Sequence, residues 1–278
     1  MGYNLWASGI ARHRGVGTSI LEVRQLFING INVRTICEEL NSYPSKSDAL
    51  QAKRDLKNNG FDVAGLENES RNLIGFVQEK DLEAGVCGDY KKEFNSKNLI
   101  SDSTPITHLL EELSKSRYLF VLTGSSVTGI VTVADLNKPP VRIYLFGIIS
   151  MLEMYMTYWI SKHYEGNEWM NYLPKARVSE AENQYRQLIE KNEEIQMVNC
   201  IQFADKKTLV AKNQGIRNLL ELGGRDRVEN NLRYAEELRN NLAHSQEDLA
   251  GKKSWAEIYN TVKWIEDFLI KSDSASKK

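Results

Sequence analysis

The pattern of apolar and polar positions changes character near Pro139 and Pro140. Before this point, short apolar runs alternate with stretches whose spacing favours helices, whereas the chain after it carries helical patterns throughout. Short apolar runs bounded by turn residues predict strands, and apolar positions spaced three and four residues apart predict amphipathic helices. The sequence therefore predicts an α+β part followed by an all-α part.

The first part contains the order helix, strand, turn, strand twice. The predicted ranges are 46–60, 61–66 and 72–78 in the first copy, and 104–116, 117–123 and 129–136 in the second. Gly60 is expected to end the first helix, and Pro105 to open the second. Both copies end on a similar cadence, GFVQEKDL from Gly75 and GIVTVADL from Gly129. This internal repeat predicts two similar modules packed together.

The second part is predicted to be a helical bundle. Its candidate helices cover roughly 141–164, 178–196, 198–213, 214–222, 226–243 and 254–270. Ser179 and Glu182 have the spacing of a capping box, which places a helix start there. Short connections between helices favour a bundle. The small polar residues of 272–278 predict a disordered tail.

Composition narrows the classes of function. The formal net charge of the 278 residues is -1, so no overall basic field favours tight nucleic-acid binding. Cys37, Cys87 and Cys200 lie far apart, which argues against a zinc cluster or a disulfide framework. A reducing, cytoplasmic setting fits this cysteine usage best. Residues 143–160 are nearly all apolar but reach only the lower length limit of a membrane span, so we expect a buried helix.

The two cadences resemble the end of the CBS module, which usually occurs as a tandem pair. The resemblance covers about residues 33–136. In that family, a Thr or Ser followed three residues later by Asp contacts the phosphate and ribose of an adenine nucleotide. The resemblance therefore implies a nucleotide site at Thr132 and Asp135, with the backbone near Thr104 lining the base. The first copy has Gln78 and Asp81 at these positions, so its hydroxyl is missing.

A simpler interpretation of the same residues remains open. Thr132 can be an ordinary strand residue, and Asp135 can cap the turn that follows it. In the nucleotide interpretation, Thr132 instead offers a hydroxyl and backbone N–H groups to a phosphate. Asp135 would then accept hydrogen bonds from the two ribose hydroxyls.

The stretch EELRNNLAHSQ, from Glu236 to Gln246, ends the predicted helix 226–243. At 100° per residue from Val228, Arg239 falls at about 20°, within an apolar stripe. A buried arginine needs a partner, such as Glu236 or Glu193, unless its stem snorkels to solvent. His244 would fall at about 160°, on the opposite face, where a histidine can simply complement the helix dipole.

The sequence RNNLAH, Arg239 to His244, matches the R-(polar)-x3-H motif of HEPN domains, and residues 139–271 resemble such a domain. The resemblance implies a homodimer in which two such helices meet in one cleft. It also implies metal-independent RNA cleavage, in which a ribose 2′-hydroxyl attacks the adjacent phosphate and leaves a cyclic phosphate. Arg239 would hold the phosphate, His244 would transfer protons or bind the phosphate, and Asn240 would orient the substrate or the arginine.

Together these patterns predict an N-terminal arm at 1–32, a tandem CBS-like module at 33–137, a HEPN-like domain at 138–271 and a tail at 272–278. The expected function is a nucleotide-regulated ribonuclease of toxin or antiviral defence type. It would bind RNA and an adenine nucleotide or related second messenger, and use no metal or catalytic cofactor. The alternatives are a non-catalytic sensor or scaffold that dimerises, and a regulatory subunit with a separately encoded catalytic partner.

Overall fold

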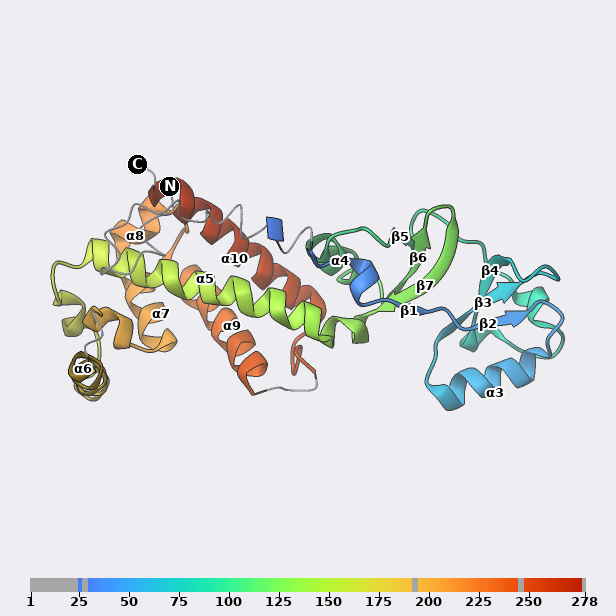
Figure 1. Ribbon diagram of the computed structural model, residues 1–278, viewed down its shortest axis with the longest axis horizontal. Coiled ribbons are helices and arrows are strands. Elements are labelled where there is room, and N and C mark those ends of the chain that lie inside the picture. Colours follow the sequence, from blue (N-terminus) through green and yellow to red (C-terminus); the bar gives the residue numbers. More distant parts are fainter. Residues whose placement is uncertain (1–24, 27–29, 192–194, 245–247, 277–278) are drawn as a thin grey trace. The chain divides into compact units, whose positions relative to one another are not determined.

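The computed structural model describes residues 25–26, 30–191, 195–244 and 248–276. The chain divides into two compact units, an α+β unit over Ile31–Pro140 and a helical unit described from Val141 to Ser276 (Figure 1). This agrees with the predicted succession of an α+β part and an all-α part. Most of the predicted N-terminal arm lies outside the described residues.

The α+β unit consists of two similar β-α-β-β repeats. Its strands are β1 (Glu38–Glu39), β2 (Ser42–Pro44), β3 (Val63–Glu67), β4 (Leu73–Gln78), β5 (Leu99–Ser101), β6 (Tyr118–Thr123) and β7 (Ser126–Thr132). The sheets have the orders β2-β3-β4 and β1-β7-β6-β5. In each repeat the first strand is parallel to the second, and the third is antiparallel to it. The predicted internal repeat is thus confirmed.

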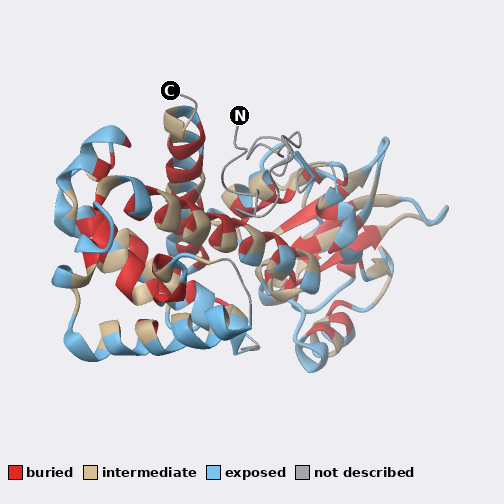
Figure 2. Ribbon diagram, turned by 60° about the vertical axis from the view of Figure 1, so that its left-hand side comes forward, coloured by how far each residue is buried: buried red, intermediate tan, exposed pale blue. Residues whose placement is uncertain are grey.

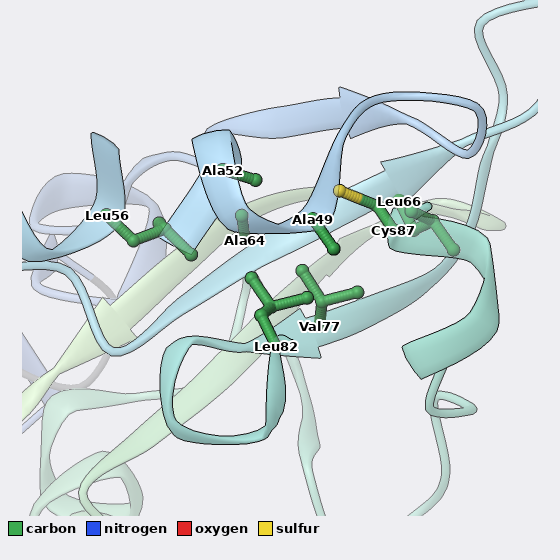
Figure 3. Close-up of a cluster of buried hydrophobic side chains, with 8 residues drawn as sticks. All are labelled: Ala49, Ala52, Leu56, Ala64, Leu66, Val77, Leu82 and Cys87. Atoms are coloured by element: carbon green, nitrogen blue, oxygen red, sulfur yellow. The ribbon is translucent and has the colours of Figure 1, made fainter. Parts of the chain in front are cut away.

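Each repeat places one helix on its sheet. Helix α3 (Ala49–Asn59) begins where the Asp48 side chain accepts a hydrogen bond from Gln51 N, and it ends at Gly60, whose φ is 70°. Helix α4 (Ile106–Leu113) follows Pro105. Figure 3 shows how Ala49 of α3 faces the sheet; the buried cluster there comprises Ala49, Ala52, Leu56, Ala64, Leu66, Val77, Leu82 and Cys87.

Aromatic side chains join the two repeats. Phe120 of β6 is fully buried and lies in one cluster with Val63 and Phe76 of the first sheet. The ring centroids of Phe76 and Phe120 are 4.7 Å apart, and those of Phe94 and Phe120 are 4.9 Å apart in an edge-on arrangement. Such aromatic pairs add to the hydrophobic stabilisation of the shared core. The repeats therefore fold against each other as one unit.

The glycine that opens each cadence allows an extra segment of chain to pass close by. A Cβ added at Gly75 would lie 2.4 Å from the carbonyl oxygen of Lys92, and one added at Gly129 would lie 2.5 Å from that of Glu38. Lys92 pairs with β4 and precedes the second repeat, whereas Glu38 pairs with β7 and precedes the first. Each sheet is therefore completed by the segment that leads into the other repeat.

The helical unit is built around its first helix. Its helices are α5 (Pro139–His163), α6 (Lys175–Glu190), α7 (Phe203–Lys212), α8 (Gln214–Leu219), α9 (Arg225–Ala243) and α10 (Trp255–Ser276). Buried residues recur along α5, as the red segments of Figure 2 show. By length and composition α5 could also cross a membrane, but 56% of its most apolar window is buried inside the protein. Such burial is typical of a core helix, as the sequence predicted.

Three consecutive charged residues tie α7 to its neighbours. Asp205 binds Arg177 of α6 at 2.9 Å, and Lys206 binds Glu153 of α5 at 2.8 Å. Lys207 binds Glu236 of α9 at 2.6 Å. Successive helical side chains point about 100° apart, so one short segment can reach three helices.

Two sequence-based expectations for this unit are wrong. Helix α6 begins at Lys175 after Pro174, so Ser179 lies within the helix and caps nothing. Proline fixes its own φ and lacks an N–H, which suits the start of a helix. The expected tail is instead helical through Ser276. Within this stretch, Trp159 Nε1 donates to Ser272 Oγ at 3.0 Å, and the Tyr155 hydroxyl donates to Asp273 at 3.2 Å.

The close passage at the second cadence predicts that Gly129→Ala destabilises the α+β unit. The new methyl group would force the Glu38 backbone away from β7, at a cost of about 1–3 kcal/mol of unfolding free energy. Urea unfolding followed by circular dichroism measures this change. Gly30→Ala is the control, because an added Cβ there meets nothing within 4 Å. Equal unfolding midpoints for the two variants would contradict the steric argument.

The buried end of α10 predicts that Ser272→Ala lowers the stability of the helical unit. It leaves the buried indole N–H of Trp159 without its acceptor, which costs about 1–3 kcal/mol. Ser274→Ala is the matched control, since Ser274 is exposed on the same turn of helix and should change stability by no more than about 0.5 kcal/mol. Thermal unfolding measures the difference between the two variants. Equal melting temperatures for Ser272→Ala and Ser274→Ala would indicate that this end of the chain is disordered.

Candidate functional site

Thr132 and Asp135, the predicted nucleotide-binding residues, lie together at the end of β7. Asp135 Oδ2 accepts hydrogen bonds from Thr132 N at 2.7 Å and from Thr132 Oγ1 at 2.9 Å. This capping box begins the short 3₁₀ helix η4 (Val133–Asn137). Asp135 thus caps the turn, as the simpler interpretation expected. Because a carboxylate offers roughly four acceptor positions, this bonding does not by itself use up its capacity for a ligand.

Lys138 connects this turn to the segment that enters the unit. Its ammonium binds Asp135 Oδ1 at 2.8 Å and the carbonyl oxygen of Ile36 at 2.6 Å, and it also binds the carboxylate of Glu38. Burial alone would lower the pKa of Lys138, but its bonds to Asp135 and Glu38 raise that pKa above the ordinary value. A permanent positive charge therefore lies beside the Thr132–Asp135 turn.

The backbone of a second cationic residue, Arg117, adjoins the turn. Arg117 O accepts a hydrogen bond from Val133 N at 3.1 Å, and the next residue, Tyr118, pairs with Thr132. The Arg117 side chain is 85% exposed and makes only a long ion pair, 3.5 Å, with Asp62. The Arg117 backbone therefore contacts the turn, while its guanidinium reaches Asp62 of the first repeat.

The corresponding turn of the first repeat is bonded differently. The short 3₁₀ helix η2 (Glu79–Asp81) follows β4. Asp81 pairs with Lys92 at 2.5 Å, and Lys92 also donates to Gln78 Oε1 at 2.7 Å. The adjacent Lys92 ammonium lowers the pKa of the Asp81 carboxyl below its usual range. Gln78 Nε2 in turn donates to the Tyr118 hydroxyl at 2.7 Å.

Thr104 does not lie beside Thr132. Thr104 follows β5, whose last residue, Ser101, pairs with Leu122, whereas Thr132 pairs with Tyr118 at the other end of β6. Four residues of strand separate these positions, which corresponds to about 13 Å. The carbonyl of Thr104 is also taken by Val33 N at 3.0 Å. The structure therefore brings Thr132 and Asp135 together and leaves Thr104 apart.

On helix α9, the structure corrects the expected position of Arg239. The buried residues of this helix are Val228, Leu232, Ala235 and Leu238, whereas Arg239 is exposed. The neighbouring helices α7, α8 and α10 pack on α9 but leave Arg239 uncovered. Glu236, one of the expected partners of Arg239, instead pairs with Lys207, and Glu193 lies outside the described residues.

Arg239, Asn240 and His244 all lie exposed near the C-terminal end of α9. Arg239 Nη1 donates to Asn240 Oδ1 at 3.3 Å. His244 follows the last helical residue, and its backbone N–H donates to Asn240 O at 3.0 Å. Within the described part of the chain, no hydrogen bond joins the side chains of Arg239 and His244. One copy of the helix thus exposes the three residues near its end, and among the described residues its hydrogen bonds join only Arg239 and Asn240 of the three through their side chains.

The sequence did not single out Arg117, Lys138, Lys92 or Glu38 as site residues. Lys138 follows Asp135 at a spacing of three, which is a weak local signal, but the other contacts depend on chain segments that meet only in the fold.

Among the described residues, no group of three or more His, Cys, Asp or Glu side chains is placed to hold a metal ion. Burial raises the pKa of the free thiols of Cys37, Cys87 and Cys200.

No family model and no curated protein matches this chain. Matching solved structures include CBS-domain proteins. One is CBSX2 in complex with AMP, with 19% identity over 41% of this chain and 99% of that one, and a TM-score of 0.36. A CBS-domain protein from Pyrobaculum aerophilum complexed with AMP has 16% identity, coverages of 38% and 90%, and a TM-score of 0.33. The CBS domain of a bacterial CNNM/CorC family Mg²⁺ transporter in complex with ATP has 16% identity, coverages of 40% and 88%, and a TM-score of 0.32.

Proposed function

We propose that this protein is a nucleotide-responsive ribonuclease, in which the α+β unit binds an adenine nucleotide and the helical unit cleaves RNA. The observation that carries the first half is the Thr132–Asp135 turn, which holds a hydroxyl and a carboxylate together with the Lys138 ammonium bound beside them. A hydroxyl, a carboxylate and an ammonium group at one turn are groups that can bind a nucleotide. The resemblance of the two cadences to CBS modules gives the same ligand class.

Each group has a definite role in this proposal. The Thr132 hydroxyl exchanges its hydrogen bond to Asp135 for one to a phosphate oxygen, and free backbone N–H groups of η4 bind the same phosphate. The Asp135 carboxylate accepts hydrogen bonds from the ribose hydroxyls while its other oxygen stays paired with Lys138. Asp135 is almost fully buried, so its position is fixed before the ligand arrives. A pre-positioned acceptor reduces the entropy that binding would otherwise cost.

The exposed end of α9 supports the second half of the proposal. Arg239 and His244 make no tertiary ion pair within the described residues, so stabilising the fold does not account for them. In a homodimer, two copies of this end would form one site. Arg239 would bind the scissile phosphate and stabilise its growing charge, and His244 would transfer protons between the 2′-hydroxyl and the leaving oxygen. Asn240 would orient the Arg239 guanidinium.

Regulation follows if the nucleotide binds two arrangements of the protein with different affinity. The site of action is then the cytoplasm, where both RNA and adenine nucleotides are present. The competing function is a sensor that dimerises and binds a partner without cleaving RNA. The two candidate functions share the nucleotide site and differ only in whether the end of α9 cleaves RNA.

We expect AMP or ATP to raise the melting temperature of the protein, because a ligand that binds only the folded state stabilises it by about 2.7 kcal/mol at a hundredfold excess over Kd. Thr132→Val should remove most of this shift by deleting the phosphate-binding hydroxyl. Thr128→Val, on the same strand but exposed and bonded to Thr123, is the matched control. Differential scanning calorimetry that finds no shift with either nucleotide would contradict the proposed ligand class.

We expect the dimeric protein to cleave single-stranded RNA in the presence of EDTA and to leave 2′,3′-cyclic phosphate ends. His244→Ala and Arg239→Ala should each lower the rate by about 10²- to 10⁴-fold, since each removes a group that acts on the reacting phosphate. His108→Ala and Arg233→Ala are matched controls, because both side chains are exposed and Arg233 lies on the same helix. If RNA is not cleaved with any nucleotide, the non-catalytic sensor is favoured. The same holds if His244→Ala and Arg239→Ala cleave RNA as fast as the wild type.

A further inference from the structure

The segment that leads from α9 to α10 lies back against α9. We call residues 248–254 the return segment; Leu249 and Ala250 within it are buried. Its backbone is held by local bonds, in which Ala250 N donates to Asp248 Oδ1 at 3.0 Å and Lys253 N donates to Ala250 O at 2.9 Å. Gly251 has a φ of 57°, a conformation that glycine adopts without strain. The return segment therefore has a defined shape against the helix.

Asn241 of α9 attaches the return segment to the helix. Its Nδ2 donates to Leu249 O at 3.0 Å, and a Cβ added at Gly251 would lie 3.4 Å from the same nitrogen. His244 lies between Asn241 and Leu249 in the chain, so this bond closes a short length of backbone that includes His244. A closed length of chain has fewer conformations than an open one. The bond consequently restricts the backbone that carries His244.

Lys253 makes a second attachment, to two other residues of α9. Its ammonium pairs with the Glu237 carboxylate and lies 3.8 Å from the centroid of the Tyr234 ring. The Lys253 side chain is only 20% exposed, whereas that of Glu237 is 47% exposed. An ammonium held over an aromatic ring is less free than one on an open surface. The charge of Lys253 therefore neutralises Glu237 at a fixed place on the helix.

Helix geometry shows which side of α9 the return segment covers. With Val228 at 0° and a step of 100° per residue, Tyr234 and Asn241 point to about 240° and 220°. Arg239 points to about 20° and Asn240 to about 120°, and both are exposed. The return segment thus lies on the side opposite Arg239 and leaves Arg239 and Asn240 open to a ligand.

Glu237 lies on the same side of α9 as His244. It points to about 180°, close to the 160° of His244, and precedes it by about 10 Å along the helix axis. RNA carries a negative charge on every phosphate, so an unpaired carboxylate this close to His244 would repel it. The ion pair with Lys253 removes most of that repulsion.

We propose that Asn241 and Lys253 are positioning residues of the proposed ribonuclease site at the end of α9. Asn241 fixes the backbone that carries His244, and Lys253 neutralises Glu237 where RNA would bind. This inference rests on the proposed function and adds two residues that do not touch the reacting phosphate. The two act on different steps, because Asn241 affects the geometry of the reaction and Lys253 affects the binding of RNA.

Steady-state cleavage of single-stranded RNA by the full-length protein tests the role of Asn241. We expect Asn241→Ala to lower kcat by about tenfold with little change in KM, because a displaced proton-transfer group slows the reaction without weakening binding. Hydrogen exchange at residues 240–244 should become faster in the same variant. Asn231→Ala is the matched control, since Asn231 Nδ2 donates to Arg227 O within α9 itself, and it should keep the wild-type kcat.

The role of Lys253 is tested by rescue. Lys253→Met should raise KM for RNA by about three- to tenfold without changing kcat, because Glu237 then repels the substrate. Lys253→Arg keeps the charge and should behave as the wild type. Adding Glu237→Gln to Lys253→Met should restore the wild-type KM. Lys252→Met is the control for losing one positive charge from the return segment, since Lys252 is exposed.

The outcomes separate this inference from the proposed function. If the wild type cleaves RNA and Asn241→Ala has the same kcat as Asn231→Ala, the role of Asn241 is wrong. If Glu237→Gln does not restore KM, or Lys252→Met raises KM as much as Lys253→Met, the role of Lys253 is wrong. Circular dichroism checks folding, and the Lys253 variants keep the test available if Asn241→Ala does not fold. A wild type that cleaves no RNA would overturn the proposed function, and this inference with it.

Discussion

The passage of one backbone directly over the glycine of each cadence is the constraint on which the α+β unit depends. Because Gly75 and Gly129 lack a Cβ, the carbonyl groups of Lys92 and Glu38 can come within a distance that a side chain would block. The segment before each repeat can thus join the sheet of the other. This exchange brings Ile36 and Glu38 to the Lys138 ammonium, so the close passage also builds the candidate site.

Because each sheet is completed by a segment from outside its own repeat, the two turns can have the same backbone but different charged neighbours. Hydrogen bonds and buried apolar side chains fix the positions of the two turns, and these are shared by both repeats. The charged residues around the turns come from segments whose side chains are not needed in the core, and they are free to differ. A fold that must keep its glycines, strands and aromatic cluster can therefore carry different charged residues at its two turns without losing its architecture.

The sequence predicted the elements that local pattern determines. The four longer strands follow from apolar runs, and the ends of the two helices follow from Gly60 and Pro105. The turn that Asp135 caps was also expected, but its bond to the Thr132 hydroxyl was not. Strands β1, β2 and β5 were missed because two or three residues carry no readable alternation. The bonds of Lys92 were also unpredictable, since Lys92 and Asp81 meet only after β4 has paired with a segment beyond η2.

The end of α10 was missed for a related reason. Its small polar residues have the composition of a disordered tail, and only the fold shows that Trp159 and Tyr155 are their buried partners.

Helix α9 shows where the periodicity argument reaches its limit. The angular position of Arg239 lies within the apolar arc, yet the residue is exposed, because an arc is buried only along the length that neighbouring helices cover. The uncovered end combines an arginine on the apolar side with a histidine beyond the last turn. Neither group is held by the chain's own ion pairs within the described residues, whereas Glu236 and Glu237 nearby are held by Lys207 and Lys253. Because Glu236 and Glu237 are already paired and Arg239 is in no ion pair within the described residues, the Arg239 charge is available for a phosphate.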